Sequence, residues 1–90
     1  MTPPMIFEGS RLELNIDTSA GGFARVEILD ERGKPIPGFT YHDADELNGN
    51  NVNMPVSWNG NQDLSSLKGK PVRLNIRMRA AKLYAFQFLP

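Results

Sequence analysis

The chain has 90 residues, with ten basic and ten acidic side chains, a net charge of zero and no cysteine. A chain of this length forms one small domain with one modest core, and without cysteine it has neither a disulfide framework nor thiolate chemistry. The balanced charge gives no electrostatic footprint for nucleic acid or an anionic membrane, and no apolar run approaches the roughly 18 residues of a membrane helix.

The first third of the chain predicts two strands. Residues 1–4 are interpreted as a flexible or cloning-derived start. Residues 11–18 place an apolar side chain at every second position, which is the period of a half-buried strand, and residues 24–28 continue the same pattern. Between these runs, Ser19-Ala-Gly-Gly22 predicts a turn, because two glycines supply the positive φ angles of tight reversals.

The middle of the chain predicts turns around one further strand. Asp30-Glu-Arg-Gly33 predicts a turn with Gly33 in the left-handed conformation. Residues 52–58 alternate again, with Val52, Met54, Val56 and Trp58 on one face. Pro55 lacks an N–H group, so this strand is expected at a sheet edge or with a bulge. Residues 63–67 predict a single helical turn capped by Asp63.

The last quarter of the chain contains the most informative pattern. Residues 72–79 alternate between apolar and polar side chains, but residues 83–89 are apolar on both faces. One face carries Tyr84, Phe86 and Phe88, and the other carries Leu83, Ala85 and Leu89. A strand that is apolar on both faces needs cover on both, so Leu83, Ala85 and Leu89 are predicted to form an outward interface.

These elements predict the fold class. Short strands separated by turn signals are typical of a sandwich, so we expect an all-β fold, a small antiparallel jelly-roll-like β-sandwich of about six to seven short strands. One domain is expected to span residues 1–90. The predicted core consists of Leu12, Leu14, Ile16, Val26, Ile28, Val56, Trp58, Val72, Leu74, Ile76 and Phe86.

Several segments resemble one bacterial group of proteins. They are Arg25-Val-Glu-Ile-Leu-Asp-Glu-Arg-Gly-Lys-Pro-Ile-Pro-Gly-Phe39, Val56-Ser-Trp-Asn-Gly60, Asp63-Leu-Ser-Ser-Leu-Lys-Gly-Lys-Pro-Val-Arg-Leu74 and Lys82-Leu-Tyr-Ala-Phe86. Together they resemble the C-terminal β-sandwich of large propeller proteins of the invertase/fructanase-like or sialidase-like glycosidase type. In that group the catalytic carboxylates lie in the propeller. The resemblance therefore implies an accessory domain with no catalytic residue of its own.

A polar loop contains the candidate metal ligands. His42, Asp43 and Asp45 precede several asparagines, and such oxygen atoms suit calcium. As an EF-hand beginning at Asp43 the loop fails, because Met54 stands where the bidentate Glu belongs. The favoured interpretation is a connection whose side chains cap its own backbone, with a metal at Asp43 and Asp45 as the weaker alternative. We expect no cofactor.

The remaining carboxylates do not predict catalysis. Glu13, Asp17 and Glu27 fall on polar strand faces beside arginines, whereas glycoside hydrolysis uses two carboxyl groups that converge across a cleft. A polar face with Arg25, Arg73, Arg77 and Arg79 is compatible with anion binding, but the carboxylates on adjacent strands favour a solvated face that neutralises itself. His42 is the only histidine, so neither a histidine-based zinc site nor a serine triad is indicated. No residue is assigned a catalytic role.

Sugar binding is the main alternative, because exposed aromatic rings can stack on sugar rings. The candidates are Phe39, Tyr41, Trp58 and Asn59. Tyr84 is a further candidate ring, but it shares the parity of Phe86 and Phe88, so core packing is favoured for it. Trp58 shares the parity of the inward residues of its strand, so core packing is favoured for it. Phe39 and Tyr41 lie in a loop, where an aromatic side chain is more often functional or covers the end of the fold.

The sequence therefore predicts a non-catalytic C-terminal module of a larger bacterial glycosidase-like protein, which packs against the catalytic propeller and stabilises it. An autonomous carbohydrate-binding module is the alternative. A self-associating interaction domain that forms a weak homo-oligomer is the third hypothesis. Neither nucleic acid nor a membrane is expected as a partner. The sequence does not fix the localisation, which is secreted or periplasmic if the parent protein carries a signal peptide.

Overall fold

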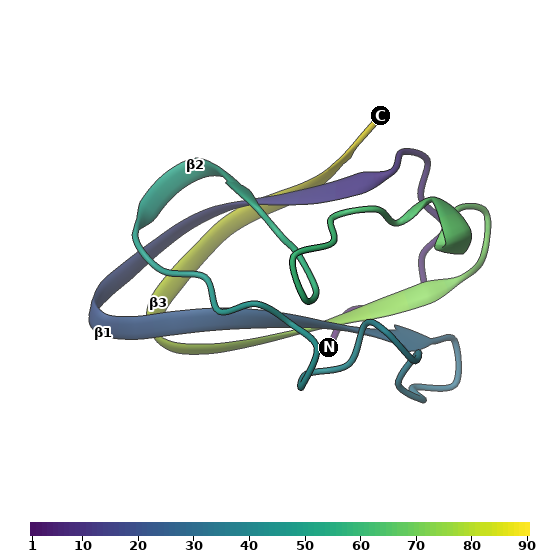
Figure 1. The fold of residues 1–90 in the computed structure, drawn as a ribbon, viewed down its shortest axis with the longest axis horizontal. Helices are drawn as coiled ribbons and strands as arrows, with labels where there is room; N and C mark the ends of the chain where they lie inside the picture. Colours follow the sequence, from purple (N-terminus) through teal and green to yellow (C-terminus); the bar gives the residue numbers. More distant parts are fainter.

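The computed structural model describes residues 1–90 and contains three strands and one short helix (Figure 1). The strands are β1 (Arg11–Asp30), β2 (Asn50–Pro55) and β3 (Val72–Leu89), and the 3-10 helix η1 spans Ser65–Leu67. They form one antiparallel sheet in the order β2-β1-β3. The predicted all-β class is confirmed, but the structure has three strands instead of six or seven short ones. It contains no helix with the length and apolarity needed to cross a membrane.

The long strands β1 and β3 pair along almost their whole length, and the ribbon that they form folds over on itself. Residues 11–18 of β1 pair with residues 81–89 of β3, which we call the first arm. Residues 23–30 pair with residues 72–79, which we call the second arm. In Figure 1 both arms run from a common corner at the left of the picture toward the right. β2 continues the sheet of the first arm along the other edge of β1.

The corner of the ribbon lies where the sequence predicts a turn. Gly21 has a φ angle of 76° and Ala80, on the facing strand, has one of 49°. Gly22 approaches β3 so closely that an added Cβ would lie 2.5 Å from the carbonyl oxygen of Ala80. The predicted turn is therefore a bend inside one continuous strand. Pairing with β3 resumes at Phe23 after a register shift, so the strands before and after the bend are not separate elements.

The hydrophobic core lies between the two arms. Its buried cluster takes leucine, isoleucine, valine and alanine side chains from the inner faces of both arms. All the predicted core residues belong to it, with Ile76 and Phe86 half-buried at its margin. The alternation of apolar side chains is sufficient to identify this face, because successive side chains of a strand point to opposite sides.

The connection between β1 and β3 covers one side of this core. Residues 31–71 contribute buried side chains to the cluster, namely Ala44, Leu47, Val56, Trp58, Leu64 and Leu67. Two predictions are confirmed within this connection. Gly33 has a φ angle of 82° and its N–H donates to the carbonyl oxygen of Asp30, which closes the predicted turn. The predicted helical turn is η1, although its N-cap is Leu64 and not Asp63; Asp63 lies one residue earlier and accepts a hydrogen bond from the N–H of Ser65.

The N-terminal segment lies along the other edge of the second arm. The N–H of Thr2 donates to the carbonyl oxygen of Leu74 at 2.9 Å, and Met5 and Val72 exchange two backbone hydrogen bonds. The ring of Phe7 stacks on Phe88 with 4.3 Å between the centroids. Residues 1–4 are predicted to be a flexible start, whereas the structure ties Thr2 to β3 through a backbone hydrogen bond.

Two irregularities change which side chains face the core. In β3, Asn15 pairs with Ala85 but Ile16 pairs with Leu83, so Tyr84 is an extra residue. This bulge turns Leu83 toward the core and leaves Tyr84 62% exposed, against the predicted alternation. A similar shift in β2 leaves Val52 65% exposed, although the sequence places it inward. The expectation of an edge strand or bulge around Pro55 is confirmed.

Candidate functional site

Two of the predicted sugar-binding residues are parts of the packing. Trp58 is only 2% exposed, and its indole Nε1–H donates to the carbonyl oxygen of Val26 at 2.8 Å. Phe39 is half-buried and meets Trp58 edge to face, with 5.3 Å between the ring centroids. A ring whose faces are covered by protein offers no surface for a sugar ring. Trp58 and Phe39 therefore anchor the connection onto the second arm.

The polar loop next to Trp58 holds itself together through its two aspartates. Asp43 accepts a hydrogen bond from the hydroxyl of Thr40 at 2.8 Å and a longer one from the side-chain amide of Asn59 at 3.2 Å. The bond from Thr40 is the main reason why the pKa of Asp43 lies below its ordinary value. Asn59, the fourth sugar-binding candidate, has a φ angle of 51° and is the first of the two central residues of a tight turn between Trp58 and Asn61.

Asp45 ties the same loop to the segment after β2. Its Oδ2 accepts hydrogen bonds from the hydroxyl of Ser57 at 2.6 Å and from the N–H of Gly60 at 2.8 Å. The bond from Ser57 is the largest cause of the lowered pKa of Asp45. Nowhere in the chain do three His, Asp or Glu side chains come together as metal ligands. The carboxylates of Asp43 and Asp45 instead serve as hydrogen-bond acceptors within the loop.

Tyr41, the remaining sugar-binding candidate, lies apart from this packing. It is half-buried on the outer face of the second arm, where the guanidinium carbons of Arg25 and Arg77 lie 5.2 and 4.6 Å from its ring centroid. Its N–H points to Glu27 Oε2 at 3.4 Å, and the other oxygen of Glu27 accepts from Asn75 at 3.3 Å. The structure thus brings one aromatic ring and two arginines together on one face.

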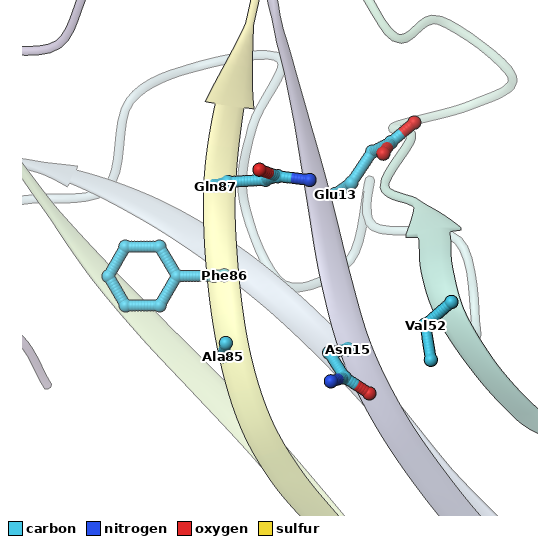
Figure 2. Close-up of a pocket in the computed structure, with 6 residues that line it drawn as sticks. All are labelled: Glu13, Asn15, Val52, Ala85, Phe86 and Gln87. Carbon is cyan, nitrogen blue, oxygen red and sulfur yellow. The ribbon is translucent and has the colours of Figure 1, made fainter.

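A shallow hollow lies on the outer face of the first arm (Figure 2). Glu13 and Gln87 are direct cross-strand neighbours, as are Asn15 and Ala85, and Val52 of β2 borders the hollow. The small side chain of Ala85 leaves the depression between the longer polar side chains. The hollow contains one carboxylate, whereas general acid–base cleavage of a glycoside uses two.

A second depression is apolar and lies along β3, between the two arms. Met1 and Thr2 border it at the N-terminus, and its other lining residues are Leu74, Ile76, Met78, Leu83 and Phe86. Met78 is 43% exposed, and Ile76, Leu83 and Phe86 are half-buried members of the core margin. We call this depression the β3 groove. Sequence alternation identifies its side chains as inward-facing, but it does not reveal that this side of the core is left uncovered.

The predicted interface residues do not form one strip. Leu83 packs against the core and lines the β3 groove, while Ala85 belongs to the hollow on the outer face. Leu89 is half-buried beside Arg11 at the far end of the first arm. The bulge at Tyr84 causes this separation, because one extra residue reverses the faces on either side of it.

No protein-family model, curated protein or solved structure matches the chain.

Proposed function

We propose that this chain is a non-catalytic C-terminal module of a larger bacterial glycosidase-like protein, in which it packs against the catalytic propeller and stabilises it. The two arms, with the core between them, then act as a small jelly-roll-like sandwich. The observation that carries the proposal is the β3 groove, because it is the place where the core margin reaches the surface.

The two sides of the core differ in their cover. The connection between β1 and β3 covers one side with six buried apolar side chains, whereas the N-terminal segment covers only part of the other. Met78 and Met1 remain exposed at the groove, and Ile76 is only half-buried. Removing such apolar surface from water favours association, although the loss of freedom of the two partners offsets part of the gain. A contiguous apolar depression on a small protein is a typical contact surface.

The free edge of β3 adds to this surface. β3 is the last strand in the order β2-β1-β3, so residues 81–89 have a strand partner on one side only. Lys82 is the only charged side chain among these nine residues. Natural edge strands usually carry charges, prolines or cover that prevent pairing with another chain. An edge with so little protection supports the view that a neighbouring domain normally lies against it.

Binding to the propeller tests this proposal. The partner is the purified propeller domain encoded next to or together with this chain, and affinity is measured by calorimetry. Met78→Lys places a charge in the groove and is expected to weaken binding by about tenfold or more, because the ammonium group loses water on docking. Val52→Lys is the matched control, since Val52 is also an exposed apolar strand residue but lies on β2, away from the groove.

Two outcomes would overturn the proposal. One is the absence of binding to the propeller together with an unchanged melting temperature of the propeller. The other is equal weakening by both lysine variants, which would mean that the groove is not the contact. Sedimentation of the isolated chain tests the self-association hypothesis, since a dimer that Met78→Lys dissociates would assign the groove to a second copy.

Carbohydrate binding remains the alternative proposal. Its case is weaker than the sequence suggests, because Trp58 and Phe39 are packed against each other. Of the candidate rings, Tyr41 lies on the outer face of the second arm and Tyr84 is 62% exposed.

A further inference from the structure

The outer face of the second arm carries an unusual pairing of like charges. Arg25 and Arg77 are direct cross-strand neighbours on β1 and β3. Like charges in this position repel each other and destabilise a sheet unless something offsets them. Arg79 lies one pair further along the same face, opposite Phe23. This face is distinct from the β3 groove, because Ile76 and Met78, on either side of Arg77, point to the other side of the strand.

The protein supplies little to offset these charges. The chain contains one ion pair, in which Arg77 lies 3.8 Å from Glu27 Oε1, a distance too long for a strong hydrogen bond. Both oxygens of Glu27 already accept from Tyr41 and Asn75. The charge of Arg25 also acts on Asp45, but that carboxylate accepts hydrogen bonds from Ser57 and Gly60. Three arginines on this face are therefore set against two carboxylates that already accept other hydrogen bonds.

Arg25 also has an unused hydrogen-bond donor. Its Nε is buried and has no hydrogen-bond partner, although buried donors are nearly always paired. Arg73, on the same face of β3, is a useful contrast, because its Nε donates to the carbonyl oxygen of Glu31 and its guanidinium reaches that of Thr2. The unpaired donor shows that the carboxylates of this face do not satisfy Arg25, and the side chain of Arg77, which is 55% exposed, is accessible to an acceptor from outside the protein.

We propose that Arg25 and Arg77, whose guanidinium groups both lie against the ring of Tyr41, bind the carboxylate group of a small organic acid. The planar guanidinium fork matches the two oxygens of a carboxylate. Arg25, Arg77 and Arg79, set against Glu27 and Asp45, leave a local charge of one positive unit, which suits a monoanion better than a phosphate, which carries nearly two negative charges at neutral pH. Asn75, whose side-chain amide donates to Glu27, lies on the same face and borders the site.

The structural alternative is that the two guanidiniums only stack on Tyr41 and hold the loop in place. Stacking of an arginine on an aromatic ring is itself favourable by a modest amount. The two interpretations differ in one measurable respect. A packing role predicts a change in stability when either arginine is replaced and no saturable binding of acids.

The test is an NMR titration of the ¹⁵N-labelled chain with glucuronate, acetate, inorganic phosphate and glucose at constant ionic strength. Saturable shifts of the Arg77 Nε–H signal and of the Tyr41 amide are expected with glucuronate and with acetate, and none with glucose. Arg77→Gln is expected to weaken binding about tenfold, the usual loss when a charged hydrogen bond is removed. The guanidinium of Arg77 is more than half exposed, so this variant should keep the fold even if Arg25→Gln does not.

Arg11→Gln is the matched control, because Arg11 is exposed on the first arm and the change in charge is the same. It should leave the affinity for glucuronate unchanged. Phosphate binding more tightly than either carboxylate would overturn the assignment of the ligand. Equal loss of affinity in Arg11→Gln and Arg77→Gln, or no saturable binding of any acid, would overturn the site. Neither result bears on docking to the propeller, since the two surfaces lie on different faces of β3.

Discussion

At the scale of single residues, Trp58 connects the long loop to the folded ribbon. Its ring is buried in the core, and its indole N–H satisfies the carbonyl oxygen of Val26 in β1. A buried aromatic residue with a polar group usually has such a partner. The alternation of apolar and polar residues along positions 52–58 predicts correctly that Trp58 is buried. The partner of its N–H lies 32 residues away in the sequence, and no local pattern identifies it.

Trp58→Ala is expected to lower the free energy of unfolding by about 3–5 kcal/mol, because the variant leaves a large cavity. Such a loss is comparable to the whole stability of a small domain. Trp58→Phe keeps most of the ring and loses the hydrogen bond to Val26, so a smaller loss is expected. Urea denaturation followed by circular dichroism measures both. An unchanged midpoint for Trp58→Ala would mean that the ring is exposed in solution.

Asp45 is expected to make the chain sensitive to acid. The hydrogen bonds from Ser57 and Gly60 favour the ionised carboxylate, so its pKa in the folded chain lies below the ordinary value of 3.8. The stability that it contributes is therefore fully present above pH 3.8 and is lost as the pH falls through the lower folded value.

Asp45→Asn should lower the urea midpoint at neutral pH and make the midpoint less dependent on pH below about 4. Asp17→Asn on the first arm is the matched control. It should change the urea midpoint at neutral pH, and the dependence of that midpoint on pH, less than Asp45→Asn does. An equally steep decline in acid for Asp45→Asn and the unchanged chain would contradict this account.

At the scale of elements, the corner of the ribbon determines that β1 and β3 each continue through the bend as one long strand. The sequence predicts a break at residues 19–22 from the two glycines, and the break is real. Local composition cannot distinguish a reversal of the chain from a bend that both strands make together. That distinction depends on Ala80, a residue 58 positions away from Gly22, whose carbonyl oxygen lies against it. The strand count predicted from the sequence is too high for this reason.

Gly22→Ala is expected to destabilise the fold strongly, by about 2–4 kcal/mol, because its Cβ would overlap backbone oxygens of Ala80 and Arg79 that cannot move independently. Gly21→Ala is the control at the neighbouring position. It meets no atom within 4 Å, so it costs only the strain of a positive φ angle, about 1 kcal/mol. Thermal denaturation of the two variants measures the difference. Equal losses would mean that the close approach of the strands relaxes easily.

The bulge in β3 gives a second comparison between adjacent residues. Leu83→Lys should lower stability by about 1–3 kcal/mol, because Leu83 packs against the core. Tyr84→Lys should change it by less than about 0.5 kcal/mol, since Tyr84 projects into solvent. Chemical denaturation of both variants at equal protein concentration checks this. The reverse order would support the regular alternation that the sequence predicts and would argue against the bulge.

At the scale of the whole molecule, the N-terminal segment acts as a partial cover of the core. Phe7→Ala removes a side chain that is 4% exposed and stacked on Phe88. We expect a loss of about 3 kcal/mol and stronger binding of a hydrophobic dye, because the side of the core next to β3 becomes more open. Ile6→Ala is the control, since Ile6 is 67% exposed. Unchanged dye binding in Phe7→Ala would show that the segment does not cover this side.

The sequence allows the core to be predicted well and the surfaces poorly, for a physical reason. The local alternation of apolar and polar residues predicts which face of a strand is buried. The structure confirms this for Leu12, Leu14, Val26 and Leu74, which are all buried. The surfaces depend on which distant segments lie side by side. Arg25 meets Arg77 because two strands pair in one register, and Tyr41 reaches them through a loop. The sequence predicts a polar face that carries several arginines. It does not predict that two of them, Arg25 and Arg77, lie against the ring of Tyr41.

The pairing of β1 with β3 also has a consequence for synthesis in the cell. The first residue of β1, Arg11, pairs with Leu89, so the sheet cannot close until the last residues of β3 have left the ribosome. Folding therefore waits for β3, and its rate is limited by bringing the two distant strands together. Domains dominated by such remote pairings fold in roughly milliseconds to seconds. Until β3 emerges, the apolar face of β1 has no strand to complete the core and must be protected by other means, so the yield of folded protein should depend on chaperones that act at the ribosome exit.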